Sequence, residues 1–141
     1  MKIEDIMQSI EEDSKLDKAA LDDEALKIPS LHSKYYRIYI NEFKILKGVE
    51  IEYSELKRHK MEYYLGKCDN QVYKDKPLDH KVLRSDLDVY MESDRELQEL
   101  YGKKCLQQEK LTMIESFIKS LVGRGFNIKN AVEFMRFRNG G

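Results

Sequence analysis

The chain has 141 residues, of which 36% are charged, and its net charge is −1. It has no apolar run of about 18 residues, so we expect no membrane-spanning helix and no membrane partner. The acidic N-terminus lacks the apolar region of a secretion signal, and the two cysteines, Cys68 and Cys105, form no C-x-x-C pair. Isolated thiols are typical of a reducing cytoplasm.

Charge is unevenly distributed along the chain. The net charge is −5 over residues 1–33, +3 over 34–82, −4 over 83–100 and +5 over 101–141. Such asymmetry indicates a partner of opposite charge, either another copy of the chain or a polyanion. A salt-bridged helical surface is the structural alternative.

The first half of the chain predicts helices separated by a proline. Residues 3–10 and 21–28 place apolar side chains at helical spacing, and Pro29 suits the first turn of a new helix. From there to Leu65 the apolar positions recur mostly at steps of three or four, which predicts one long helix, broken or bent near Gly48. Gly66 is placed to cap its end.

A polar stretch, residues 69–79, follows and predicts a loop or hinge. Beyond it, residues 85–94 read as a short helix opened by Ser85. Ser93 to Glu96 has the form of a capping box and predicts the start of a second long helix that continues to about Val122.

The sequence after Val122 predicts a separate last helix. The motif "GRG" at 123–125 is expected to end the preceding helix, and Asn127 to cap the next. Alternation suited to strands is absent over any useful length, so the predicted fold class is all-α.

No catalytic pattern accompanies these helices. The histidines His32, His59 and His80 are scattered and match no metal-binding motif, and there is no phosphate-binding glycine loop. We therefore expect no enzyme, no metal and no cofactor.

The stretch "LKRHKMEYYLGKC" at 56–68 is the best candidate for a binding site. Basic residues there surround the adjacent Tyr63 and Tyr64, which point about 100° apart on a helix, so one ring is expected to be accessible. Cations can neutralise phosphates and rings can stack on bases, which suits single-stranded nucleic acid. The alternative is a helix end whose cations oppose the helix dipole. Tyr35, Tyr39 and Phe43 are instead expected on a packed core face.

Two motifs resemble the UvsY recombination mediators of T-even-like phages. They are "RHKMEYYLG" at 58–66 and "RGFNIK" at 124–129, and weaker agreement includes "SKYY" at 33–36 and "KVLRSDLDVYMESD" at 81–94. The resemblance covers nearly the whole chain. It departs after Gly66, where this chain reads "KCDNQVY".

The resemblance implies a non-enzymatic protein that assembles into a ring, binds single-stranded DNA, and helps a RecA-like recombinase replace single-strand-binding protein. It implies the cytoplasm of an infected bacterium as location. It assigns DNA binding to Arg58 and Lys60, and self-assembly to the segment around Arg124–Phe137. The predicted DNA-binding region is residues 1–68, and the predicted oligomerisation region is residues 80–141. The candidate DNA contacts are Lys57, Arg58, Lys60, Tyr63, Tyr64 and Lys67, and the candidate self-association residues are Arg124, Phe126, Ile128, Val132 and Met135. A helical adaptor or scaffold without nucleic-acid binding is the alternative function.

Overall fold

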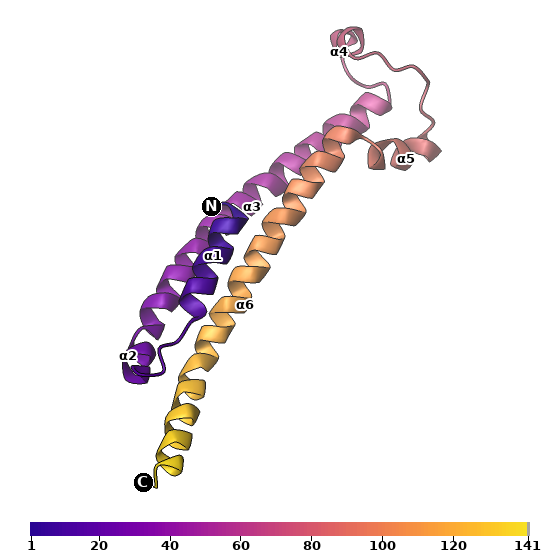
Figure 1. Cartoon of the computed structure of the whole chain (residues 1–141). Coiled ribbons are helices and arrows are strands. Elements are labelled where there is room, and N and C mark those ends of the chain that lie inside the picture. The colour runs from indigo at the N-terminus through magenta and orange to yellow at the C-terminus, as the bar shows by residue number, and fades with distance from the viewer. Residues whose placement is uncertain (141) are drawn as a thin grey trace. The chain divides into compact units, whose positions relative to one another are not determined.

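The computed structural model describes residues 1–140, which fold entirely into helices and their connections, as predicted (Figure 1). Two helices are far longer than the rest and account for most of the chain. The elements are α1 (Ile3–Ser14), α2 (Leu21–Leu26), α3 (Ile28–Tyr64), α4 (Asn70–Asp75), the 3-10 turn η1 (Arg84–Asp86), α5 (Leu87–Glu92) and α6 (Arg95–Arg138).

The chain divides into two compact units. The first combines Met1–Lys44 with the chain from Gln108 onward, and the second is Ile45–Gln107. Each long helix contributes one part to each unit. The sequence predicted a functional boundary at residues 69–79. The division into compact units does not test that boundary, which stays a prediction.

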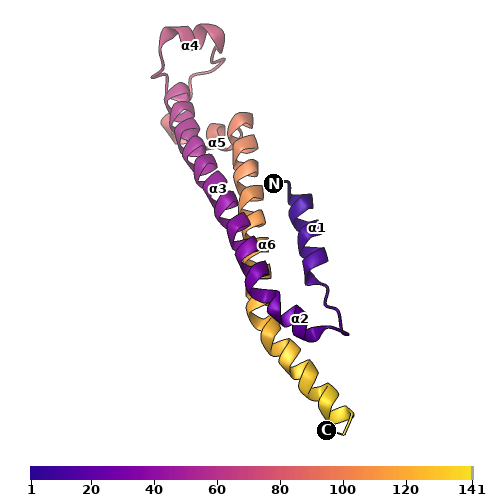
Figure 2. The ribbon, with the colours of Figure 1, turned by 90° about the vertical axis from the view of Figure 1, so that its left-hand side faces the viewer.

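The first unit has a core at which α1, α3 and α6 meet. Figures 1 and 2 show α1 alongside the segments of α3 and α6 that belong to this unit. The Tyr35 ring lies edge-on to Phe117 with centroids 4.6 Å apart, and its hydroxyl donates a hydrogen bond to Asp13. The buried core residues are Ile6, Tyr35, Ile114, Phe117 and Leu121.

Helix α6 is continuous through "GRG", so the prediction of a separate last helix capped by Asn127 is wrong. A glycine inside a helix costs only about 0.5–1 kcal/mol relative to alanine. Burial of Leu121 and Ile128 on either side opposes that cost. Arg124 between them donates a hydrogen bond of 2.9 Å to the carbonyl of Asp13, which holds this turn of the helix against the end of α1.

Helix α3 also begins and ends as predicted but is not broken. Pro29 lies in its first turn, and the helix continues through Gly48 to Tyr64.

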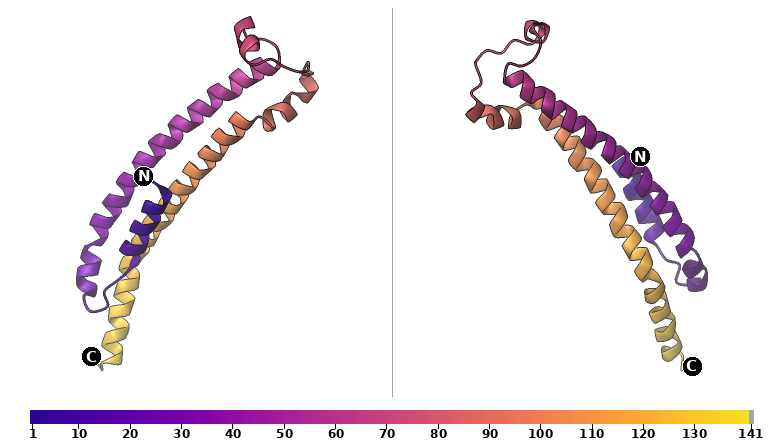
Figure 3. Two further views of the ribbon diagram at one scale, coloured as in Figure 1. Left: turned by 45° about the horizontal axis from the view of Figure 1, so that its top comes forward. Right: turned by 180° about the vertical axis from the view of Figure 1, so that it is seen from behind.

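The segment 69–79 differs from its prediction as a loop, because it contains α4. Figure 3 shows α4 and α5 in the second unit as short helices joined by an extended connection.

The structure at the start of α6 corrects the predicted N-cap of this helix. Asp94, and not Ser93, caps the helix: its Oδ1 accepts a hydrogen bond of 3.1 Å from the backbone N–H of Leu97. The Ser93 hydroxyl donates instead to the carbonyl of Val89. The short helix expected after Ser85 is present as α5, but Ser85 lies within η1 and does not cap it.

Candidate nucleic-acid interface

The candidate interface is built on the last turns of α3, and Gly66 ends that helix as predicted. Gly66 has a φ of +76°, a conformation that glycine adopts without strain. Its N–H donates to the carbonyl of Tyr63 at 3.2 Å, and the N–H of Lys67 donates to that of Glu62 at 2.9 Å. This is the Schellman pattern of a helix end. It leaves Lys67 outside the helix and exposed.

Lys57 and Arg58 are exposed on the same stretch of α3. Neither forms a salt bridge with any part of the chain that the structure describes. Lys57 lines a hollow of about 260 Å³ together with the carboxylate residues Asp88 and Glu92. Arg58 lines neither of the hollows described for this unit.

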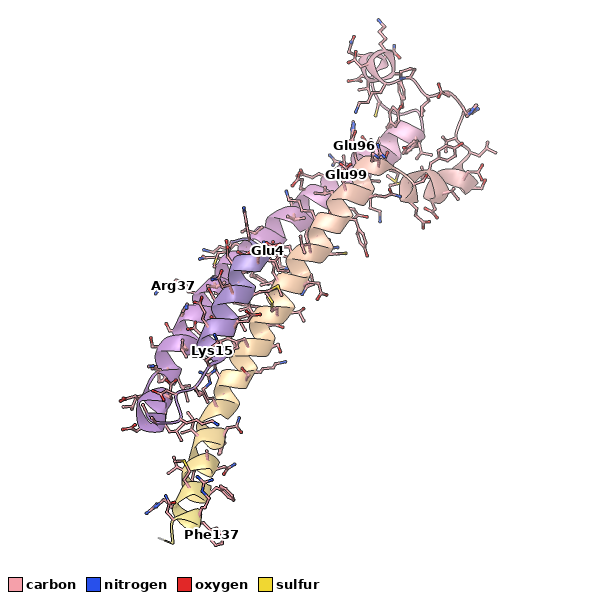
Figure 4. All side chains as sticks on the ribbon, viewed as in Figure 1. Glu4, Lys15, Arg37, Glu96, Glu99 and Phe137 are labelled. Carbon is pink, nitrogen blue, oxygen red and sulfur yellow. The ribbon has the colours of Figure 1, made fainter. Side chains whose placement is uncertain are left out.

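Lys60 is placed differently from Arg58, although the sequence made the two look equivalent. It is only 8% exposed. Its Nζ lies 3.2 Å from Oδ2 of Asp94 and 3.5 Å from Oε2 of Glu96. Glu96, labelled in Figure 4 at the start of α6, also pairs with Lys76 at 3.1 Å. The charge of Lys60 is therefore satisfied within the protein.

Asp94 is the centre of this arrangement, and the sequence patterns did not point to it. One carboxylate oxygen caps α6, and the other accepts a 2.6 Å hydrogen bond from the Tyr64 hydroxyl and pairs with Lys60. Burial raises the pKa of Asp94, but the bonds from Tyr64, the Leu97 N–H and Lys60 outweigh it and hold the pKa below its ordinary value of 3.8. The Ser-x-x-Glu pattern indicated Ser93 as the cap, so the neighbouring Asp94 was not predicted to have this role.

The two adjacent tyrosines are both engaged in internal contacts. Tyr63 stacks on Tyr73 with centroids 5.5 Å apart and planes 16° apart, and its hydroxyl donates to the carbonyl of Lys76. Tyr64 lies against Tyr63 and Tyr90, at centroid distances of 5.2 and 5.8 Å. Both residues are half-buried, so the expectation that one ring is accessible stays a prediction. Burial and the hydrogen bond to Asp94 raise the pKa of Tyr64.

Tyr73 connects the segment after Gly66 to the end of α3. Its hydroxyl donates to the carbonyl of Tyr63 at 2.8 Å and accepts from the backbone N–H of Cys68 at 3.2 Å. Tyr73 thus ties α4 to the end of α3. The only signal in the sequence was a single aromatic residue within a polar stretch.

The candidate self-association residues separate into two groups. Arg124 and Ile128 are buried within the first unit, where Arg124 donates a hydrogen bond to the carbonyl of Asp13. The others, Phe126, Val132 and Met135, are exposed near the end of α6. At about 100° per residue, Phe126, Phe134 and Phe137 fall within about 80° of one another, and we call these three the terminal apolar face. Val132 and Met135 lie on another side of the helix, where they line a hollow with Lys18 and Leu21. Phe137, labelled in Figure 4, is 81% exposed.

Over residues 1–140 no three His, Cys, Asp or Glu side chains come together in a way that could hold a metal ion. Among the helices described, none is long and apolar enough to cross a membrane.

The fold and the site define a class: an all-α protein that presents exposed basic side chains at the end of a long helix. The profile of one family, described as the recombination, repair and ssDNA-binding protein UvsY, matches residues 9–141. The chain therefore belongs to the UvsY family, which confirms the resemblance of its two motifs.

Solved structures of the bacteriophage T4 recombination mediator protein UvsY share the fold. One crystal form superposes with a TM-score of 0.86 at 20% identity, covering 100% of this chain and 99% of that one. Two further forms give TM-scores of 0.84 and 0.81, at 19% and 17% identity, and cover 95% and 98% of this chain and 98% and 99% of theirs. A search of curated protein sequences found no match.

Proposed function

We propose that this protein is a recombination mediator that binds single-stranded DNA and helps a RecA-like recombinase replace single-strand-binding protein on it. The family match over residues 9–141 carries the proposal, since that family is described by recombination, repair and ssDNA binding. The T4 relative with the same fold is a recombination mediator, which supports the same role. The protein acts as a binding protein and not as an enzyme, in the cytoplasm of the infected host.

Within this function, Arg58 is the main phosphate contact, assisted by Lys57 and Lys67. All three are exposed, and a flexible cation on the surface can meet a phosphate without breaking an internal pair. Lys60 has a different role. It is a positioning residue whose pair with Asp94 fixes the start of α6 against the end of α3. Tyr63 and Tyr64 support the same corner and do not stack on bases.

Self-association would repeat this small basic site once in each copy of the chain. The terminal apolar face exposes large side chains, and an exposed apolar patch marks a contact surface. Packing of this face between copies produces a ring-like homo-oligomer that repeats Arg58 once per subunit. Linked sites bind a long strand more tightly than one site does, with no new kind of contact.

A salt titration of binding to an unstructured oligonucleotide tests the site. Arg58→Ala should weaken binding on all sequences alike, because phosphate contacts carry no base information. It should also reduce the slope of log affinity against log salt by about 0.7 for the lost contact. Arg84→Ala is the matched control, since it removes the same charge from an exposed position in η1. Equal effects of the two substitutions would mean that net charge alone matters.

A second experiment tests mediation itself. A RecA-like recombinase with DNA-dependent ATPase activity is inhibited when single-strand-binding protein already covers the strand. Addition of this protein should restore the ATPase rate, and the Arg58→Ala variant should restore it less. If the wild-type protein neither bound the oligonucleotide nor restored the rate, the adaptor function would replace the mediator function.

A further inference from the structure

An aromatic ladder lies along α3 in the first unit, whereas the interface described above belongs to the second. His32, Tyr36, Tyr39 and Phe43 stack in sequence, with successive centroids 6.2, 6.2 and 6.1 Å apart and interplanar angles of 7°, 25° and 22°. Offset stacking at such distances is the arrangement that aromatic rings favour. We call these four residues the aromatic ladder.

Most of the aromatic ladder is exposed, although Tyr39 is half-buried and packs against the core. Of the residues expected to share a core face, only Tyr35 is buried. Tyr36 is 53% exposed and Phe43 is 37% exposed. At about 100° per residue, the four ladder positions fall within about 60° of one another on the helix. They therefore form one continuous stripe beside the core.

The stripe is held in place and borders a hollow. The Tyr39 hydroxyl donates a 2.8 Å hydrogen bond to Glu115 of α6, which fixes the ring. Beside it is a hollow of about 400 Å³, lined by His32, Tyr36, Tyr39, Glu115, Ile118 and Lys119. That volume lies in the range of small-ligand sites.

The charge around the aromatic ladder is mainly positive, and the Glu115 carboxylate beside it already accepts the hydrogen bond from Tyr39. Between Ile28 and Lys44, α3 carries a single carboxylate, Glu42, and it is only 1% exposed. Arg37 and Lys44 lie about 80–100° round the helix from Tyr36, on the solvent side of the stripe. Neither has a salt bridge among the described residues, and Figure 4 shows Arg37 projecting outward from α3. Lys119 of α6 is a further cation, at the hollow.

We propose that the aromatic ladder is a second contact surface for single-stranded nucleic acid, on which bases stack while Arg37, Lys44 and Lys119 meet the backbone. Stacked rings with cations alongside are the arrangement by which proteins bind single strands without sequence preference. The proposal rests on the proposed function, because it assumes that the protein binds single-stranded DNA. It adds a site at which stacking, rather than phosphate contact alone, contributes to affinity.

Binding of an unstructured oligonucleotide by stacking-deficient variants tests the proposal. His32→Ala with Tyr36→Ala should weaken binding about tenfold, the value of roughly one lost base stack. The salt slope should stay unchanged, because stacking releases few ions. Arg37→Ala with Lys44→Ala should instead reduce the slope. Both pairs are exposed, so circular dichroism should report unchanged helix content.

Matched variants at one position separate stacking from apolar contact. Tyr36→Phe keeps the ring and should bind normally, whereas Tyr36→Leu keeps apolar area but loses the ring and should bind weakly. Photo-crosslinking of an oligonucleotide that carries 5-iodouracil should label the peptide that contains residues 28–44.

Three results would overturn the proposal. They are normal binding by the His32→Ala/Tyr36→Ala variant, equal binding by Tyr36→Leu and Tyr36→Phe, and crosslinks confined to residues 57–67. Normal binding with an altered sedimentation mass would assign the ladder to contact between copies. Failure of the wild-type protein to bind any oligonucleotide would overturn the proposed function instead, so the two failures are distinguishable.

Discussion

Lys60 and Asp94 form a largely buried ion pair that joins the end of α3 to the start of α6. The Nζ–Oδ2 distance is 3.2 Å, and the side chains are 10% and 6% exposed. The same carboxylate caps α6 and accepts the Tyr64 hydroxyl. One acidic group thus satisfies a helix terminus, a cation and a phenol, and a change at Asp94 removes this partner from all three.

Replacement of Lys60 should reduce stability rather than the salt dependence of DNA binding. In Lys60→Met the Asp94 carboxylate loses its cation but keeps Tyr64 and the Leu97 N–H. We expect the free energy of unfolding to fall by about 1–3 kcal/mol. Lys57→Met, an exposed neighbour, should change it by no more than about 0.5 kcal/mol. Urea denaturation followed by circular dichroism measures both. A Lys60→Met protein of normal stability with a reduced salt slope would instead make Lys60 a phosphate contact.

The contribution of Asp94 should depend on pH. Because its pKa in the folded protein is below the ordinary value of 3.8, the group stabilises the fold at pH values above 3.8. That stabilisation should be lost as the pH falls through the lower folded-state pKa. Asp94→Asn should therefore be less stable than the wild type at pH 7, and the difference should shrink toward pH 3. Thermal melts across this range measure it. A difference that stayed constant with pH would contradict the assignment.

Replacement by alanine should have opposite effects on stability at two glycines. Gly66 has a φ of +76°, so Gly66→Ala places a side chain in a left-handed conformation and should cost about 1–2 kcal/mol. Gly102 lies inside α6 with no atom within 4 Å of an added Cβ, so Gly102→Ala should stabilise by about 0.5–1 kcal/mol. Denaturant midpoints measure both. A stabilised Gly66→Ala protein would show that the end of α3 is not closed in this way.

Substitutions near the end of α6 should distinguish residues needed for assembly from residues needed for folding. Phe134→Asp with Phe137→Asp alters two exposed rings of the terminal apolar face and should reduce the particle mass in sedimentation, with helix content retained. Arg124→Ala removes a buried contact with Asp13 and should lower stability instead. An unchanged mass in the double variant would exclude this face as the contact between copies.

Limited proteolysis tests whether residues 69–79 act as a hinge. Because α4 occupies part of that segment, we expect the first cut in the connection that follows it. Trypsin cleaves poorly before proline, so Lys76 is protected by Pro77, and the first tryptic cut should follow Lys81. Mass spectrometry of early fragments identifies it. First cuts within α6 would show that this helix opens more readily than the connection.

Local patterns in the sequence determined much of the fold. Apolar spacing indicated helices throughout, Pro29 marked the start of α3, and Gly66 marked its end, because each depends on neighbouring residues alone. The motifs at 58–66 and 124–129 were enough to indicate the family. Glycines were a weaker guide, since α6 continues through Gly123 and Gly125 where burial of neighbouring side chains opposes their cost.

Only the tertiary structure decided which side chains are available for binding. Lys60 and Arg58 are two residues apart and chemically alike, yet one is paired with a carboxylate 34 positions along the chain and the other is exposed. Tyr36 was left exposed while Tyr35 was buried, because only one of two adjacent helical positions can face the core. Burial and ion pairing depend on groups distant in the sequence, and no local spacing specifies them.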